Sequence, residues 1–129
     1  MSKNTVERTN GGIAVTCKAD ATVDLAKGEG VVFITGSYVV TNIPDQNTPA
    51  QGIALEAHSS GVYECIPVLI PGPVVRIVAS GAVTAGNFLN ASATTMGQWV
   101  VDAGDPTGIA LEDADDGDEL DMCFVGQGF

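Results

Sequence analysis

Gly52–Glu56 reads GIALE, and the same five residues return at Gly108–Glu112. The copies lie 108 − 52 = 56 positions apart, and at the same offset Gly61 matches Gly117. Self-similarity at a fixed offset is the sequence signature of a structural unit that is used more than once. The 129-residue chain is therefore expected to contain two similar halves.

The repeated unit has the pattern of a β-hairpin. GIALE is a short run of strand formers, a loop with one glycine follows it, and a second apolar run returns. Glycine near the end of such a loop supplies the positive φ that closes the turn. In the second copy Leu120, Met122 and Phe124 alternate with other residues, which predicts one apolar face. The 56-residue offset places Glu64, Ile66 and Val68 at the equivalent positions of the first copy.

Helix signals are scarce, because glycine, proline and β-branched residues interrupt almost every stretch. Short runs of strand formers bounded by turn residues recur instead. The sequence predicts a mainly β fold, a small β-barrel or sandwich of short antiparallel strands with two duplicated hairpins. The expected strands are Ile13–Cys17, Val31–Thr35, Tyr38–Thr41, Gly52–Glu56, Tyr63–Ile70, Val74–Ala79, Phe88–Ala91, Gln98–Asp102, Ile109–Glu112 and Glu119–Val125.

The length favours a single domain. Residues 1–12 are polar and rich in turn formers, which predicts a flexible N-terminal arm. Residues 13–129 are expected to form one β domain with pseudo-repeats at about 20–72 and 74–129. Pro71-Gly72-Pro73 marks the expected hinge between the halves, because neither proline can donate to a strand ladder.

The charge is strongly negative and unevenly spread. Residues 1–76 hold five bases and seven acids, whereas residues 77–129 hold nine acids and no base, which together give a net charge of −11. Such a chain repels phosphate backbones, so no nucleic-acid partner is expected. No apolar stretch reaches the roughly 20 residues of a membrane span, and the N-terminus lacks a secretory signal. Synthesis in a cytoplasm without membrane attachment is expected.

Catalytic signals are weak throughout. His58, the single histidine, lies in a predicted hairpin loop and is expected to be solvated. Cys17, Cys65 and Cys123 lack metal-ligand spacing and are expected to be buried free thiols. Trp99, on a predicted strand, is expected in the core. The sequence therefore predicts neither an enzyme nor a cofactor.

The acidic run from Glu112 to Asp121 is the one candidate metal site. It fails the EF-hand register, because Ala114 falls at the third and Cys123 at the twelfth position when Gly117 is the sixth. A looser calcium site would use Asp113, Asp115 and Asp116. A solvated loop tip is the preferred interpretation, so no metal is expected.

The second half resembles the small capsid-cement, or head-decoration, proteins of tailed bacteriophages. The shared features are a V-x-x-G-x-V-x-x-G segment at 78–86, the strand Gly108–Leu111, Gly117-Asp118 after the acidic loop, and a closing strand of the V-x-G-x type at Val125–Phe129. The resemblance covers about the last 55 residues well. It implies a mainly β, non-enzymatic virion protein on the capsid exterior that binds and stabilises the major capsid protein lattice as a homo-oligomer, with a trimer favoured.

The N-terminal arm is not part of the shared pattern, and its role is inferred from its residues. Strand addition to the capsid would give the arm main-chain hydrogen bonds, and its basic side chains could meet capsid carboxylates. The candidate capsid-binding residues are Lys3, Arg8, Thr9, Asn10 and Arg76. For Arg76 two positions are compatible with the sequence, against a capsid subunit or against an acid of its own hairpin.

Three alternatives stay open. The chain could be a tail or fibre accessory protein of a virion. It could be a small β-barrel ligand-binding or carrier module, although lipoyl-type domains carry a lysine at a hairpin tip and the tips here are His58-Ser59-Ser60 and Asp115-Asp116. It could also be a hydrolase or lyase whose site forms between subunits, in which His58 would face the acids of a neighbouring chain.

Overall fold

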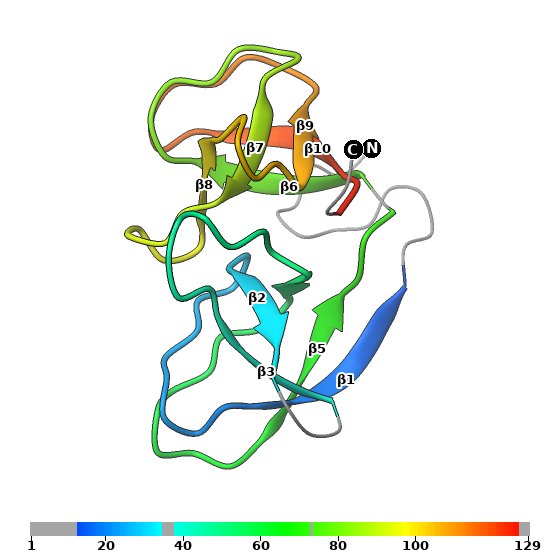
Figure 1. Ribbon diagram of the computed structural model, residues 1–129, viewed down its shortest axis with the longest axis vertical. Coiled ribbons are helices and arrows are strands. Elements are labelled where there is room, and N and C mark those ends of the chain that lie inside the picture. Colours follow the sequence, from blue (N-terminus) through cyan, green and yellow to red (C-terminus); the bar gives the residue numbers. More distant parts are fainter. Residues whose placement is uncertain (1–12, 35–37, 73, 127–129) are drawn as a thin grey trace.

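The computed structural model describes residues 13–34, 38–72 and 74–126, and every regular element in these ranges is a strand. Each of the ten predicted strands overlaps an observed one, so the mainly β prediction is confirmed (Figure 1). The described ranges contain no helix able to cross a membrane. The strands are β1 (Ala14–Ala19), β2 (Gly30–Phe33), β3 (Val39–Asn42), β4 (Gly52–Ala54), β5 (Cys65–Leu69), β6 (Val74–Ala79), β7 (Phe88–Ala91), β8 (Gln98–Val101), β9 (Gly108–Ala110) and β10 (Glu119–Phe124).

The strands close two small barrels, one from each half of the chain. The first has the strand order β1-β3-β2-β4-β5 and the second β6-β8-β7-β9-β10. Each strand of the second barrel therefore takes the place of the strand that is five earlier in the chain. Most neighbours are antiparallel, as expected, but β1 pairs with β3 and β6 with β8 in parallel. Each of the ten described strands therefore has a neighbour on both sides.

Both GIALE segments start the predicted hairpins, β4–β5 and β9–β10. The offset of 56 does not persist into the return strands. Ile53 pairs with Leu69 and Ile109 with Cys123, so Leu69 and Cys123 are equivalent at an offset of 123 − 69 = 54. The first loop spans residues 55–64 and the second 111–118, which is two residues shorter. The predicted match of Glu64 with Leu120 is therefore wrong.

The correct inward pairs follow from the strand registers. Cys17 pairs with Ile66 in the first barrel, and Ile77 pairs with Leu120 in the second, so Ile66 is the counterpart of Leu120. All four side chains are buried. Shortening the loop by two residues preserves the inward face, because side chains alternate along a strand with a period of two.

Two hydrophobic clusters fill the molecule. One lies inside the first barrel and includes Cys17, Val40 and Ile66. The other fills the second barrel and extends into the first, where Ile53 and Leu69 belong to it. Trp99 is fully buried in this second cluster, which confirms its predicted place in the core. The two barrels therefore share a continuous apolar contact.

Polar side chains from the second barrel and from the β3–β4 loop join the barrels at the same contact. Asn90 accepts a hydrogen bond from the Ala50 amide at 3.0 Å and donates one to the Thr48 carbonyl at 2.9 Å. Gln46 donates to the Ala91 carbonyl at 2.9 Å. The barrels are stacked along the long axis of the molecule (Figure 1). Paired polar groups fix their relative orientation, because a buried polar group without a partner is costly.

Candidate interaction surfaces

Four of the five candidate capsid-binding residues, Lys3, Arg8, Thr9 and Asn10, lie outside the described residues. The fifth, Arg76, lies on β6 opposite Asp121 of β10. Its Nη1 donates to Glu112 Oε2 and to Asp121 Oδ1, both at 3.0 Å, and its Nε lies 3.8 Å from Glu119 Oε1. Its side chain is only 13% exposed.

The acids around Arg76 stabilise its positive charge. Burial alone would lower the pKa of Arg76, but the hydrogen bonds to Asp121 and Glu112 raise it above its usual value. Glu112 also accepts the Asp121 amide at 2.9 Å, so the acids are themselves tied to the barrel. Arg76 is thus engaged by acids of its own barrel, and a capsid contact would have to compete with them.

His58 is not solvated, and that prediction is wrong. Its side chain is buried at the end of the first barrel, with Nδ1 2.7 Å from Glu64 Oε1 and Nε2 3.2 Å from the Asp20 carbonyl oxygen. The backbone of His58 forms a bridge with Leu25, which pulls the loop back over the barrel end. No hydrogen bond of the ring within the described chain reaches a serine or a cysteine, as nucleophilic catalysis would require.

The three cysteines are free, but only one fits the expected burial. Cys17 is fully buried, and this burial, with a smaller contribution from Cys65, raises the pKa of its thiol. Cys65 is exposed and Cys123 is half-buried, so the prediction of buried thiols is wrong for these two. Both lie on strands whose inward positions belong to their neighbours, and they therefore face outward.

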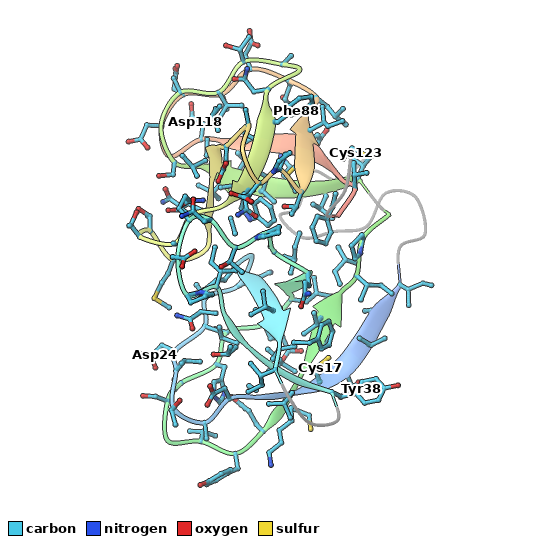
Figure 2. All side chains as sticks on the ribbon, viewed as in Figure 1. Cys17, Asp24, Tyr38, Phe88, Asp118 and Cys123 are labelled. Carbon is cyan, nitrogen blue, oxygen red and sulfur yellow. The ribbon has the colours of Figure 1, made fainter. Side chains whose placement is uncertain are left out.

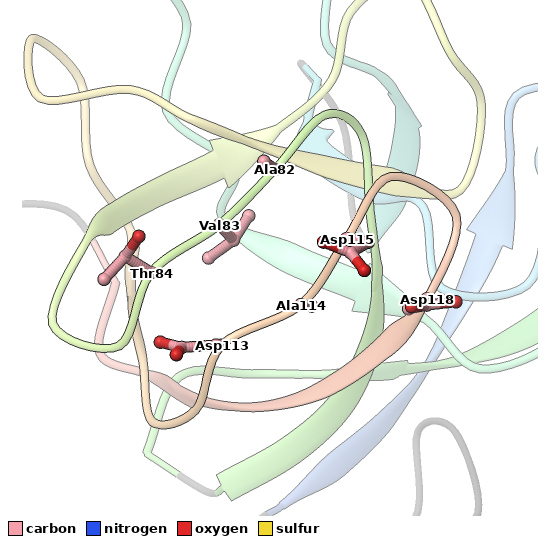
Figure 3. Close-up of a pocket in the computed structure, with 7 residues that line it drawn as sticks. All are labelled: Ala82, Val83, Thr84, Asp113, Ala114, Asp115 and Asp118. Carbon is pink, nitrogen blue, oxygen red and sulfur yellow. The ribbon is translucent and has the colours of Figure 1, made fainter.

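The acidic loop borders an open hollow of about 360 Å³ at the end of the second barrel (Figure 3). Asp113 Oδ1 accepts the Ala85 amide at 2.8 Å, and Asp116 Oδ1 accepts the Gly81 amide at 2.7 Å. In the described chain no three His, Cys, Asp or Glu side chains gather as a metal site would require. Two of the three candidate calcium ligands, Asp113 and Asp116, thus close the loop onto the β6–β7 turn.

The hollow follows from a difference between the repeats. Val83 bridges Ala114 in the second barrel as Leu25 bridges His58 in the first, so Ala114 stands where the first barrel has His58. The histidine ring fills the first barrel end, whereas the methyl group of Ala114 lines the hollow together with Val83 (Figure 3). The end of the second barrel therefore lacks the large side chain that the first barrel holds at this position.

Large apolar side chains are exposed on both barrels. Tyr38 and Tyr63 on the first barrel are 61% and 81% exposed, and the Lys18 ammonium lies 6.0 Å from the Tyr63 ring centroid. Leu111 on the second barrel is 49% exposed. Exposed tyrosines and apolar side chains of this kind are typical of protein-binding surfaces. The other strongly exposed ones are Ile13, Phe33, Ile34, Val62, Phe88, Met96, Val101 and Val125.

No family model matches the chain, and no curated protein matches it. Among solved structures it is similar to the N base of the head fibre protein gp8.5 of bacteriophage phi29. The two share 16% sequence identity with a TM-score of 0.68, over 91% of this chain and 99% of that one. At this identity the likeness shows the fold, and it includes both barrels because nearly the whole of each chain is matched.

Proposed function

We propose that this chain is a structural protein of a bacteriophage virion and that it sits on the outer surface of the head. The observation that carries the proposal is the likeness to a head fibre base over 91% of this chain and 99% of that one. A match of that extent in both directions covers a whole two-barrel unit. The resemblance of about the last 55 residues to head-decoration proteins supports the same place in a virion independently.

The surface chemistry supports a binding role without catalysis. The His58 ring contacts the Glu64 carboxylate and the Asp20 carbonyl oxygen. Several acids of the second barrel are paired with Arg76 or accept backbone amides. The acidic second half disfavours nucleic acid as a partner and would keep decorated particles apart by charge repulsion. The proposed partner is the major capsid protein, with the chain acting as a homo-oligomer, for which a trimer is favoured.

Two forms of this function differ in what the bound protein does. A cement protein stabilises the capsid lattice, since it contacts several capsid subunits at once and gains from multivalent attachment. A fibre base anchors a projecting appendage and need not stabilise the shell. The resemblance to head-decoration proteins favours the first form, and the phi29 fold likeness favours the second.

Lys3, Arg8, Thr9 and Asn10 of the N-terminal arm are the proposed capsid contacts. Strand addition would supply main-chain hydrogen bonds, and the two basic side chains would pair with capsid carboxylates. Arg76 is a weaker candidate, because its Nη1 already serves two acids at 3.0 Å.

The test mixes the purified protein with phage heads that lack it and measures occupancy by co-sedimentation and electron microscopy. Saturable binding at defined lattice positions is expected, and absence of binding to any capsid surface would overturn the proposal. Deletion of residues 2–12 should abolish occupancy, whereas Lys27→Gln, an exposed basic residue on the first barrel, should leave occupancy unchanged. Full occupancy by the truncated protein would refute the role of the arm.

The same decorated heads distinguish the two forms. A cement protein should raise the temperature at which heads release their DNA, because it binds the assembled lattice and not the dispersed subunits. A fibre base should bind at equal occupancy and leave that temperature unchanged.

A further inference from the structure

The hollow at the end of the second barrel has a filled counterpart in the first barrel. Leu25 bridges His58 in the first barrel and Val83 bridges Ala114 in the second, each through two backbone hydrogen bonds of 2.8 and 2.9 Å. The glycine that closes the loop after each bridge has φ of 85° in the first barrel and 84° in the second. The two loops therefore have closely similar backbones up to these glycines, and they differ in the side chain that occupies the barrel end.

The carboxylate that holds the His58 ring also has a counterpart in the second barrel. Glu64 Oε1 lies 2.7 Å from Nδ1 of this ring. The Ala19 amide donates to the Glu64 carbonyl at 3.0 Å, and the Ala79 amide donates to the Asp118 carbonyl at 2.9 Å, so Asp118 stands where the first barrel has Glu64. Each of these acids comes two residues before the first buried residue of its return strand. Both carboxylates therefore lie at the same end of their barrels.

The second barrel keeps this carboxylate but has no ring to pair with it. Asp118 lines the hollow together with Asp113 and Asp115 (Figure 3). The first barrel has the neutral residues Ala57 and Ser59 at the positions equivalent to Asp113 and Asp115. Among the described residues, the carboxylates of Asp115 and Asp118 form neither a hydrogen bond nor an ion pair. The hollow thus has unpaired negative charge where the first barrel has a neutral loop and a resident ring.

The walls of the hollow are held in place without a ligand. Asp113 accepts the Ala85 amide at 2.8 Å and Asp116 accepts the Gly81 amide at 2.7 Å, which ties the loop to the β6–β7 turn. The volume of about 360 Å³ is at the low end of the roughly 300–1,000 Å³ of small-ligand sites. Figure 2 shows Asp118 on the outside of the second barrel, where it is exposed. A partner can therefore reach the hollow with the tip of a side chain.

The lining of the hollow favours a flat cation. Residues 77–129 hold nine acids and no base, so the field at the hollow attracts positive charge. In the described ranges no three acids gather as a metal site requires, which favours a cation with directional N–H donors. Val83 and Ala114 give the hollow an apolar wall against which a planar group can pack. A lysine ammonium fits less well, because it is compact and strongly hydrated.

We propose that this hollow binds a planar cationic side chain of a partner protein, an imidazolium or a guanidinium group. The group would take the place that the His58 ring has in the first barrel. Asp118 would accept its hydrogen bond as Glu64 accepts that of His58, and Asp115 would be a second acceptor at the rim. The site adds a contact to the proposed function and does not depend on it, because the isolated chain already carries the complete hollow.

The test titrates the full chain, without capsids, with imidazolium, guanidinium or methylammonium chloride at pH 6 and constant ionic strength. The backbone amide NMR signals of Ala114 and Asp118 report on the hollow, and those of Leu25 and His58 report on the filled end of the first barrel. The two planar cations should shift the first pair saturably, with dissociation constants on the order of 10 mM for such small fragments. Methylammonium should bind at least about tenfold more weakly. The tighter of the two planar cations identifies the side chain as histidine or arginine.

Two variants locate the binding in the hollow. Asp118→Asn removes the main acceptor, and Ala114→His supplies a ring from within the chain. Each should raise the dissociation constant of the planar cations by at least about tenfold. The matched control is Glu56→Gln, which removes one exposed carboxylate outside the hollow and should change that constant by less than about twofold.

The converse variant tests the equivalence of the two barrel ends. His58→Ala should open a hollow beside Glu64, and imidazolium should then shift the Leu25 amide and raise the melting temperature of the variant. Absence of saturable shifts at Ala114 and Asp118 in the wild type would overturn the proposal. So would equal binding of methylammonium, or unchanged binding by Asp118→Asn, because either indicates general attraction to a negative surface. These outcomes decide the proposal even if His58→Ala is unfolded, since Asp118 is an exposed residue.

Discussion

The indole nitrogen of Trp99 donates a hydrogen bond to the Gly28 carbonyl across the contact between the barrels, at 2.9 Å. The same ring meets Phe124 edge to face inside the second barrel, with centroids 5.9 Å apart. Trp99 therefore serves both as core of its own barrel and as a polar link to the other. A single side chain couples the stability of the second core to the docking of the first barrel.

Trp99→Phe should lower the free energy of unfolding by about 2–4 kcal/mol, because the variant leaves a cavity and removes the hydrogen-bond donor for the Gly28 carbonyl. Urea denaturation followed by circular dichroism measures the change. Tyr63→Phe, which removes a polar atom from an 81% exposed ring, is the control and should change stability by less than about 0.5 kcal/mol. Equal effects of the two substitutions would contradict the structural role of the indole.

Gly30 lies where the first barrel packs tightly against the second. Gly30→Ala would bring a Cβ atom within 2.3 Å of the Ala91 Cβ and 2.8 Å of the Ala50 Cβ. Overpacking of this kind should cost about 1–3 kcal/mol. Gly104→Ala is the matched control, since its new Cβ would have no contact closer than 3.6 Å. Adding Ala91→Gly to Gly30→Ala should restore part of the lost stability, and a strictly additive double variant would refute the predicted clash.

The sequence predicted the strands well because their signals are local. Short runs of strand formers bounded by turn residues marked all ten, and the GIALE repeat located both hairpins. Those local signals could not predict that the strands close two separate barrels. Closure depends on pairs that are distant in sequence, such as β1 with β3 and β6 with β8. An ungapped comparison of the two halves could not detect that the second loop is two residues shorter. This difference shifts the alignment of the return strands by two residues, and a shift by an even number of residues leaves the pattern of inward side chains unchanged.

The environment of single polar residues was harder to predict. His58 looked solvated because it lies in a loop, but the bridge to Leu25 folds that loop over the barrel end. Cys65 looked buried because of its residue type, yet the register gives the inward position to Ile66.

Calcium should leave the melting temperature unchanged. Oδ1 atoms of Asp113 and Asp116 already accept backbone amides, at 2.8 and 2.7 Å, and calcium needs six to eight oxygen ligands at once. Differential scanning fluorimetry with calcium chloride, with magnesium chloride at equal ionic strength as the control, measures the effect. A rise of several degrees specific to calcium would mean tight binding to the folded state and would restore the acidic loop as a metal site.

Arg76→Met should destabilise the second barrel by about 1.5–3 kcal/mol, because it removes charged hydrogen bonds and leaves Glu112, Glu119 and Asp121 close together. These acids are partly exposed, so part of the loss is like-charge repulsion that salt screens. The deficit measured in urea should therefore shrink between low and high sodium chloride. Lys27→Met, at an exposed position, is the control, and a deficit that does not depend on salt would argue against the repulsion.

Glu29 gives the fold a predictable dependence on pH. Its side chain is buried, and this burial raises its pKa above the usual 4.5, although the hydrogen bond from the Ala26 amide lowers it and the charge of Asp24 raises it slightly. The second barrel has Asn87 in the equivalent turn, where its Oδ1 accepts the Thr84 amide at 2.9 Å. A neutral amide can thus make the bond that the buried carboxylate makes.

Glu29→Gln should therefore be more stable than the wild type near neutral pH. A folded-state pKa above the unfolded one favours the protonated group in the folded protein. The stability that Glu29 contributes is then fully present below pH 4.5 and is lost as the pH rises through the raised pKa. The advantage of Glu29→Gln should grow with pH from about 4.5 upward and then level off. Urea unfolding of both proteins between pH 3.5 and 8 measures it, with Glu56→Gln as the control for loss of one charge. A difference between Glu29→Gln and the wild type that stays constant over this range would contradict the raised pKa.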